Sequence, residues 1–523
     1  MSLVQSLAGS RVARKIADAG FVRVAHSRVA KLDRMNVGQV QERTLLELVR
    51  KAKNTRFGQE HDFGRIHSVK DFQARVPVLD YEFFWERYWK DAYPVLDDLT
   101  WPGKIPYYAL SSGTTSGTTK YVPISWEMVR SNRHAALTTM AFVKHAYPQM
   151  DLFKGKFFFL GGSTDLRTQS DGSFAGDLSG IAAKEVTPLM RPYTFPSLEM
   201  TLLSDWETKI GILAEQAVKE PITALSGIPS WMLILFDRVK AIAGKRTVGD
   251  VWPDLRLVIH GGTSFDGYRD LFKKEIGNDA VKFCEVYPCS EGFIATEDPR
   301  YPGLMRVVPD HDIFFEFVPM TEYDDHGKLK PNPVRHSLTN VEIGQDYAVL
   351  LTNCAGQWAN QIGDTVRFER RDPPLLKFTG RTKFFLSAFG EHLITEEVEA
   401  AVTHASKEAN VSWVDLHVGP VFPADPKQPG YHLYLIEFRD AAPPDLEKFA
   451  SLIDRELCRL NEDYAAHRIG DLTMLRPRIR VVPSGGFHGW MKSRGKFGGQ
   501  NKVPRMDNTA KLTRELVAFL DVL

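Results

Sequence analysis

Between residues 156 and 262, apolar runs that end in glycine alternate with stretches of helical periodicity. The run at residues 156–160 precedes two glycines, and similar runs end at Gly227 and Gly261. Short apolar runs bounded by turn residues are typical of fully buried strands, and their alternation with helices is typical of sheets covered by helices. The sequence therefore predicts an α/β fold.

The chain has 523 residues, which is more than one hydrophobic core usually supports. A breaker cluster at residues 370–374 and a basic connector at residues 377–383 interrupt the α/β pattern, and a new helical pattern begins after Glu391. We therefore expect a large N-terminal domain, residues 1–380, and a smaller α+β C-terminal domain, residues 381–523.

The formal net charge is +1, so no global basic field favours nucleic acid as a partner. Four cysteines are scattered without a CxxC pair or a His-rich cluster, which favours a reducing, cytoplasmic compartment and no structural zinc. No apolar run of about eighteen residues predicts a membrane span. The basic segment at residues 1–33 fits either a transit peptide or an amphipathic helix, and we favour the helix.

One stretch, from Ser111 to Lys120, carries seven hydroxyl side chains, two glycines and one lysine. Glycines let backbone N–H groups converge, and hydroxyls and a lysine add donors and charge, which together suit phosphate oxygens. Apolar flanks at residues 105–110 and 121–124 predict strands on both sides, which argues against a flexible linker. The spacing argues against a Walker A loop, because Gly117 arrives one position early and no hydroxyl residue follows Lys120. We expect a nucleotide-phosphate loop in which Lys120 has no fixed contact.

Two further loops follow apolar strands, as ligand loops do at the carboxyl ends of buried strands. After residues 257–260, paired glycines would allow close backbone approach to a flat ring or a sugar, and a tight strand-to-helix turn explains them equally well. After residues 283–288, Ser290 and Glu291 occupy a turn. A carboxylate there could hold Mg²⁺ against phosphate oxygens, and a surface glutamate is the plainer interpretation.

Several other features of the sequence can be interpreted either as functional or as purely structural. Asp364 follows Gly363 beside a strand, so it could accept both ribose hydroxyls or simply belong to a turn. Aromatic residues at helical spacing in residues 80–89 are assigned to core packing, which is also favoured for Trp231 over a place in a substrate pocket. The basic, glycine-rich residues 485–505 favour a mobile loop that brings a lysine to a phosphate site over nucleic-acid contact.

Taken in chain order, the hydroxyl-rich loop, the glycine loop after residue 260, the Ser290–Glu291 turn and Gly363-Asp364 resemble the successive motifs of adenylate-forming enzymes. They are similar in particular to those of the acyl-acid amido synthetases, the Gretchen Hagen family. The resemblance rests on residues 111–115, on the strand at residues 315–319, and on residues 500–505, which are similar to the family's Gln-Tyr-Lys-Thr-Pro-Arg. It extends from about residue 40 to the end of the chain, and we expect a bacterial member.

The resemblance implies an enzyme that uses ATP and Mg²⁺ to convert a carboxylic acid into an acyl-adenylate, with release of pyrophosphate. The amine of an amino acid then attacks the activated carbonyl and forms an amide. Glu291, Lys502 and Ser112 would be catalytic, and Glu291 would also be the metal ligand. Lys383 would be the pivot of the smaller domain. The residues implied to bind ATP are Ser111, Ser112, Gly113, Thr114, Thr115, Lys120, Gly261, Gly262, Thr263, Ser264, Tyr287, Ser290, Asp364 and Arg381.

The chain departs from the plant motifs in two places. It has Asn-Gln-Ile-Gly-Asp at residues 360–364 where plant members have Tyr-Arg-Val-Gly-Asp, and Tyr-Pro-Cys-Ser-Glu at residues 287–291 where they have Tyr-Ala-Ser-Ser-Glu. Plant substrate preferences are therefore not carried over, and the acid, the amino acid and the oligomeric state stay open. An acyl-CoA synthetase and a non-catalytic nucleotide-binding protein are the alternatives.

Overall fold

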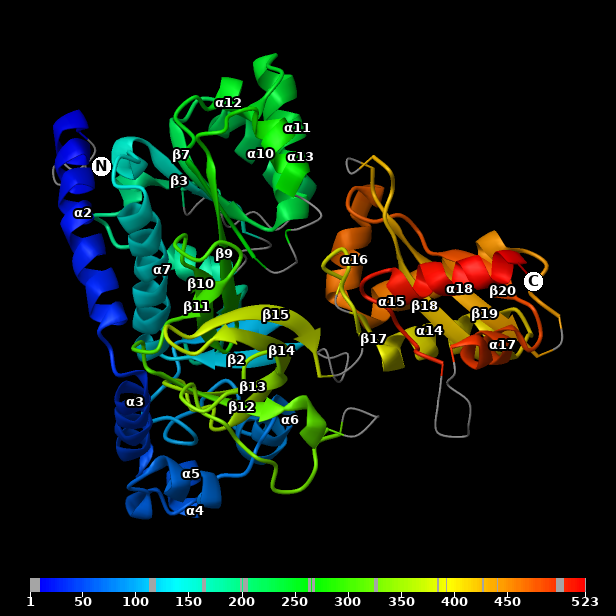
Figure 1. Ribbon diagram of the computed structural model, residues 1–523, viewed down its shortest axis with the longest axis horizontal. Coiled ribbons are helices and arrows are strands. Elements are labelled where there is room, and N and C mark those ends of the chain that lie inside the picture. The colour runs from blue at the N-terminus through cyan, green and yellow to red at the C-terminus, as the bar shows by residue number, and fades with distance from the viewer. Residues whose placement is uncertain are drawn as a thin grey trace. The chain divides into compact units, whose positions relative to one another are not determined.

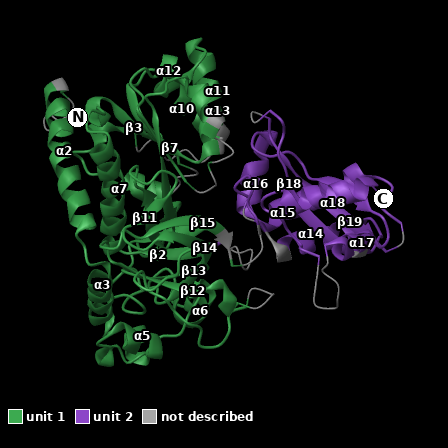
Figure 2. Cartoon of the chain, viewed as in Figure 1, with its two compact units in different colours: residues 1–111, 120–382 green, residues 112–119, 383–523 purple. Residues whose placement is uncertain are grey.

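A computed structural model describes most of the chain, namely residues 10–111, 119–161, 166–197, 200, 206–261, 265, 269–323, 328–382, 385–391, 393–425, 428–439, 441–494 and 503–522. The described residues fall into two compact units (Figure 2). The first comprises residues 1–111 and 120–382, and the second includes residues 383–523.

The first unit is built on a large mixed sheet whose strand order is β12-β13-β14-β15-β11-β10-β9-β8-β7-β3-β6. One part is parallel and consists of β3 (Lys156–Phe159), β6 (Thr194–Phe195), β7 (Ile222–Gly227), β8 (Leu257–His260) and β9 (Lys282–Cys289). The other part is antiparallel and consists of β10 (Gly292–Glu297), β11 (Met305–Val307), β12 (Ile313–Pro319), β13 (Asp346–Asn353), β14 (Asn360–Arg370) and β15 (Leu375–Arg381). The predicted α/β fold is confirmed, and the pairing changes from parallel to antiparallel at β9.

Helices cover both faces of the parallel part. Side chains of α10 (Trp206–Ala217), α11 (Pro229–Ala243), α12 (Val248–Val251) and α13 (Arg269–Ile276) share one apolar cluster with Phe158, Leu225 and Val258. The alternate residues Phe157, Ala224 and Leu257 form another cluster with Val143 of α7 (Trp126–Ala146). Each strand therefore buries both of its faces, which explains the continuous apolar runs.

Helix α2 (Arg11–Asp33) lies along α7 (Figure 1), which confirms the N-terminal helix. The Lys144 ammonium of α7 is fully buried against the Asp18 carboxylate of α2, so an ion pair joins the two helices. Ser125 begins α7 as predicted, because its side-chain oxygen accepts a hydrogen bond from the Met128 N–H at 3.0 Å.

A second sheet in this unit has the order β2-β1-β5-β4, with β1 (Tyr107–Ser111), β2 (Lys120–Ile124), β4 (Arg167–Thr168) and β5 (Phe174–Gly176). The aromatic segment forms α6 (Tyr81–Phe84) and η2 (Trp85–Trp89), and its buried rings join the core beneath this sheet, as predicted. The remaining elements of the unit are α3 (Val37–Ala52), α4 (Arg56–Glu60), η1 (Phe63–Arg65), α5 (Val69–Arg75), η3 (Leu152–Lys154), α8 (Leu178–Lys184), η4 (Arg191–Tyr193) and η5 (Met320–Glu322).

The second unit is an α+β structure with its own core. Its sheet has the order β18-β19-β20, formed by β18 (Trp413–Val421), β19 (Tyr431–Phe438) and β20 (Arg478–Val482). Apolar side chains of these strands pack against α14 (Thr395–Glu408) and α15 (Leu446–Leu460). The unit also contains β16 (Phe385–Leu386), β17 (Leu393–Ile394), α16 (Glu462–Arg468), η6 (Ile469–Asp471), α17 (Gly486–Ser493) and α18 (Lys511–Val522).

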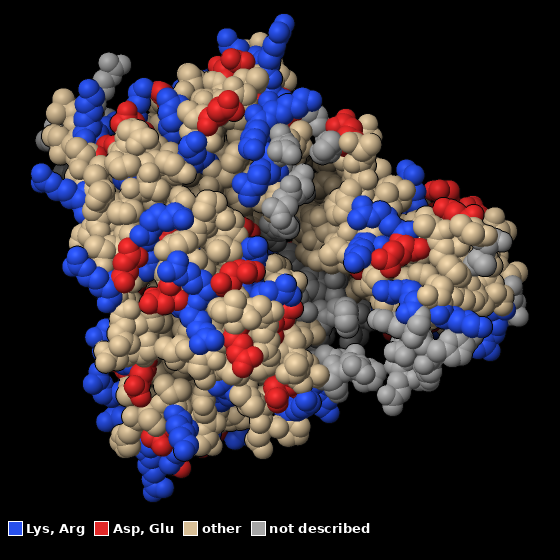
Figure 3. Space-filling model, in the orientation of Figure 1, with Lys and Arg blue, Asp and Glu red and all other residues tan. Residues whose placement is uncertain are grey.

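Lysines and arginines are interspersed with acidic side chains on the face drawn in Figure 3, in keeping with the net charge of +1. Among the residues that the structure describes, we find no helix with the length and apolar character that a membrane crossing requires.

Candidate functional site

The expected phosphate loop is held at both ends by a strand pair. Strands β1 and β2 run antiparallel, and Ser111 lies opposite Lys120 in their register. The predicted flanking strands are confirmed. Residues 112–118, which include Ser112, Gly113, Thr114 and Thr115, lie outside the described residues.

Lys120 is buried at the start of β2. Its ammonium nitrogen lies 2.8 Å from a carboxylate oxygen of Glu82 and 4.8 Å from the centroid of the Tyr81 ring. A buried ammonium with an ion-pair partner and an aromatic face has a defined position. The expectation that Lys120 lacks a fixed contact is therefore wrong, because α6 supplies partners that lie almost 40 residues earlier in the sequence.

Tyr81 helps to hold β2. Its hydroxyl oxygen accepts a hydrogen bond from the Tyr121 N–H at 2.8 Å. Burial raises the pKa of the Tyr81 hydroxyl, and the nearby charge of Glu291 contributes to the same shift. Sequence reasoning assigned Tyr81 only to the core and missed its polar contacts. An acidic residue inside the aromatic stripe, Glu82, was the available signal.

Ser290 and Glu291 form the turn between β9 and β10, as the sequence predicted. The Asn353 side-chain amide donates a hydrogen bond to the Glu291 carbonyl oxygen at 2.7 Å. Gly292 follows with φ of 153°, and a Cβ at this position would lie 2.4 Å from Ile313 Cδ1. The turn thus contacts β12 through Ile313 and β13 through Asn353, and Asn353 is a supporting residue that no local motif indicated.

Tyr287 and Asp364 are 77 positions apart in the sequence and are in contact in the structure. The Tyr287 hydroxyl donates a hydrogen bond to Asp364 Oδ2 at 2.8 Å, and Asp364 is buried. Asp364 lies inside β14, opposite Arg381 of β15, so the turn interpretation of Gly363-Asp364 is wrong. Gly363 has φ of 87°, and its carbonyl accepts the Thr382 N–H at 2.8 Å, which fixes the backbone beside Asp364.

Cys289 is the last residue of β9, and its thiol donates a hydrogen bond to the Gly292 carbonyl oxygen at 3.1 Å. Burial raises the pKa of its thiol well above the usual value, and the charges of Glu291 and Asp364 raise it further. The charges of the metal candidate and the ribose candidate therefore both act on the half-buried Cys289 thiol. The structure thus joins Tyr287 to Asp364 by a hydrogen bond and places Glu291 in the turn after the strand of Tyr287, and the sequence had singled out all three residues.

Gly261 directly follows β8 and lies close to the neighbouring strand β9. A Cβ at this position would lie 2.4 Å from the Val286 carbonyl oxygen. This contact with β9 leaves no room for a side chain and is enough to require glycine at residue 261. Close approach to a ligand is therefore not needed to explain Gly261, which favours the interpretation as a strand-to-helix turn. Gly262, Thr263 and Ser264 of the expected adenine loop lie outside the described residues, as do Lys502 and the proposed pivot Lys383.

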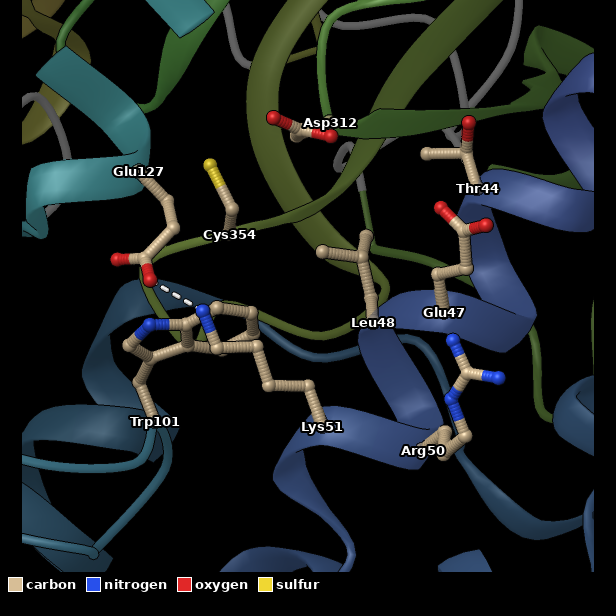
Figure 4. A pocket seen from close by; sticks show the side chains of 9 residues that line it. All are labelled: Thr44, Glu47, Leu48, Arg50, Lys51, Trp101, Glu127, Asp312 and Cys354. Carbon is tan, nitrogen blue, oxygen red and sulfur yellow. Dashed lines mark hydrogen bonds and ion pairs between the residues drawn. The ribbon is translucent and has the colours of Figure 1, made fainter. Parts of the chain in front are cut away.

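A cavity of about 500 Å³ lies elsewhere in the first unit (Figure 4). It contains the Lys51–Glu127 ion pair, with the Lys51 ammonium 5.1 Å from the centroid of the Trp101 ring. It contains none of the predicted site residues. Its lining residues are Thr44, Glu47, Leu48, Arg50, Lys51, Trp101, Glu127, Asp312 and Cys354.

The described residues contain no group of three or more His, Cys, Asp or Glu side chains able to hold a metal ion by themselves. Magnesium commonly takes one or two carboxylates, with phosphate oxygens and waters as its other ligands. Glu291, in the turn between β9 and β10, supplies one carboxylate of this kind. The donor set thus fits a magnesium ion that is held jointly with a nucleotide.

The helix-covered mixed sheet with a separate α+β unit is the architecture of adenylate-forming enzymes. The structure is similar to that of AtGH3.15 acyl acid amido synthetase in complex with 2,4-DB, with a TM-score of 0.59 and 19% identity over 95% of this chain and 96% of that one. It is also similar to 2-hydroxyisobutyryl-CoA ligase in complex with 2-HIB-AMP and CoA, with a TM-score of 0.56 and 15% identity over 93% and 92% of the two chains.

Comparison with models of protein families identifies the family more specifically than the structural similarity does. The chain matches the GH3 family N-terminal domain at residues 28–172 and 167–281, the central domain at residues 306–381 and the C-terminal domain at residues 396–511. It therefore belongs to the GH3 family. Similar relatives include jasmonoyl–L-amino acid synthetase JAR4 of Nicotiana attenuata, 22% identical over 87% of this chain and 88% of that protein. Indole-3-acetic acid-amido synthetase GH3.4 of Arabidopsis thaliana is 23% identical over 90% and 89% of the two chains.

Proposed function

We propose that the protein is an acyl-acid amido synthetase, which uses ATP and Mg²⁺ to form an acyl-adenylate and then transfers the acyl group to an amino acid. The observation that carries this proposal is the hydrogen bond from Tyr287 to the buried Asp364, with Glu291 in the turn that follows the strand of Tyr287. Membership of the GH3 family, with relatives named for amide synthesis from two different acids, supports the same reaction.

In this proposal Tyr287, Asp364 and Glu291 each have a defined task. The Tyr287 hydroxyl occupies one Asp364 oxygen and orients the carboxylate, which then accepts the ribose hydroxyls of ATP. Ser111 and the residues that follow it bind phosphate oxygens, and Lys502 supplies a positive charge to them. Glu291 holds Mg²⁺, which when bound stabilises the negative charge that develops on pyrophosphate.

The first half of the reaction is tested by acid-dependent exchange of pyrophosphate into ATP. We expect Glu291→Gln to reduce the exchange rate by about 100-fold or more, because it removes the charge and keeps the shape. Glu86→Gln is the matched control. Glu86 is an exposed ion-pair partner of Lys90, so this variant should exchange pyrophosphate at the wild-type rate. Normal exchange by Glu291→Gln would overturn the metal assignment.

The second half is tested by offering amino acids and coenzyme A in parallel to the enzyme with acid and ATP. Amide formation is the expected result. A thioester product instead would favour an acyl-CoA synthetase, the second candidate, which has support from the fold shared with 2-hydroxyisobutyryl-CoA ligase. ATP binding without pyrophosphate release for any acid would indicate a non-catalytic protein.

We also propose that the protein acts in the cytoplasm. All four cysteines are free thiols, which fits a reducing compartment. Fractionation of the native host with detection of the protein in the cytosolic fraction tests this proposal.

A further inference from the structure

His260 is a buried side chain that no step of the proposed reaction uses. It is the last residue of β8, directly before Gly261, and its relative exposure is 1%. The imidazole stacks on the Phe265 ring, with 3.7 Å between centroids and 14° between the planes. Neither ring nitrogen has a hydrogen-bond partner among the residues that the structure describes.

Two unpartnered ring nitrogens in the interior are costly, because a buried polar group loses its hydrogen bonds to water. Burial lowers the pKa of His260 to about 3, so the ring is neutral at physiological pH. A neutral imidazole has one N–H donor and one nitrogen acceptor. The position would be better filled by an apolar ring unless a ligand completes the hydrogen bonds.

The surroundings of His260 indicate which part of the substrates the ring would meet. Gly227 of β7 lies opposite His260, and a Cβ on Gly227 would lie 3.1 Å from Leu160 Cβ and 3.3 Å from Met232 Cγ. Phe265 and Trp231 belong to the same apolar cluster, on the face of the sheet covered by α11 and α13. This apolar face at the carboxyl end of a parallel strand suits a carbon skeleton, with the Arg269 guanidinium 5.3 Å from the centroid of the Phe265 ring.

We propose that His260 binds a hydroxyl group on the acyl acid, and that the enzyme therefore prefers hydroxylated carboxylic acids to their deoxy analogues. This inference rests on the proposed function. A hydroxyl can donate to the acceptor nitrogen or accept from the N–H, so it gives one of the two ring nitrogens a partner, whereas an unsubstituted acyl chain would leave both of them without one. The imidazole is a specificity-determining group, and adenylate chemistry itself does not require it.

The test compares matched acids in the pyrophosphate-exchange assay. The probes are benzoate with 2-, 3- and 4-hydroxybenzoate, and hexanoate with 2- and 6-hydroxyhexanoate. We expect the wild-type enzyme to favour at least one hydroxylated acid by about tenfold or more in kcat/KM, the kind of discrimination that a hydrogen-bonding site provides. In His260→Phe, which keeps the stacked ring, the preference should disappear while the KM for ATP stays unchanged. His260→Asn should retain part of the preference.

Unfolding in urea separates a ligand contact from a structural role. The midpoint for His260→Phe should equal or exceed that of the wild type, because the change removes two unpartnered nitrogens. His311→Phe is the matched control and should unfold at lower urea, since the His311 ring donates to the Phe293 carbonyl at 2.6 Å. A lower midpoint for His260→Phe, a changed KM for ATP, an unchanged acid preference or a wild type without preference would each overturn the inference. Failure of every acid to support exchange would instead overturn the proposed function.

Discussion

At the scale of single residues, Tyr81 serves both the core and the candidate site. Its ring packs in the aromatic core, where it also lies beside the Lys120 ammonium, and its hydroxyl accepts the Tyr121 N–H. The hydroxyl therefore helps to hold the strand that follows the phosphate loop. Core burial and polar contact are distinct contributions, and they can be separated by removing the oxygen alone.

Tyr81→Phe should reduce the unfolding free energy by about 1–3 kcal/mol, because the partly buried Tyr121 N–H loses its acceptor. It should also slow pyrophosphate exchange, since the start of β2 is less well held. Urea unfolding and the exchange assay measure the two effects. Tyr88→Phe is the control, because Tyr88 donates to the partly exposed Glu60 carboxylate at 2.6 Å. Equal behaviour of the two variants would contradict the role given to Tyr81.

The buried histidine His311 should make the free energy of unfolding depend on pH. Burial lowers its pKa from 6.5 to about 4, against the opposing effects of Asp310 and of the bond to the Phe293 carbonyl, while His134 and Arg28 lower it further. Between pH 6.5 and 4 the unfolded chain binds the proton and the folded chain does not. His311 should thus contribute up to about 3 kcal/mol above pH 6.5, and this contribution should be lost as the pH falls toward 4.

The measurement is the urea midpoint as a function of pH for the wild type and His311→Gln. The variant should be less stable at neutral pH and should lose less stability on acidification. Parallel pH profiles would show that the acid sensitivity arises elsewhere in the chain.

At the scale of elements, the close contact between β8 and β9 restricts residue 261. Gly261→Ala should cost about 1–3 kcal/mol, because the new Cβ would meet the Val286 carbonyl oxygen and the backbone would have to move. Gly20→Ala is the matched control in helix α2, where nothing lies within 4 Å of the new Cβ, and it should raise stability by about 0.5–1 kcal/mol. Thermal unfolding of both variants measures the difference, and a stable, fully active Gly261→Ala would contradict the contact.

At the scale of the whole molecule, we propose that the two units are separate folding domains whose boundary in the sequence lies near residues 380–383. Each has its own apolar core, and the second unit also contains the Glu391 carboxylate, which accepts the Phe389 N–H at 2.7 Å and lies 2.7 Å from His432 Nε2. A buried pair of this kind stabilises only the unit that contains it.

Calorimetry of the intact protein should therefore show two unfolding transitions. Glu391→Gln should lower one of them by several degrees and leave the other in place, because losing one partner of a buried pair costs about 3–5 kcal/mol. Thr296→Val, a change in the first unit, should move only the other transition. A single transition that shifts in both variants would show that the units unfold together.

The sequence by itself determined the α/β pattern, the strands around the Ser/Thr/Gly stretch, and Glu291 as a turn carboxylate. These features are local, since burial periodicity, glycine turns and N-caps depend on residues close together in the chain. The tertiary structure decided the partners. It paired Lys120 with Glu82, Tyr287 with Asp364 and His260 with Phe265. Strand order and register bring these residues together, and both depend on the packing of the whole sheet, which no single segment specifies.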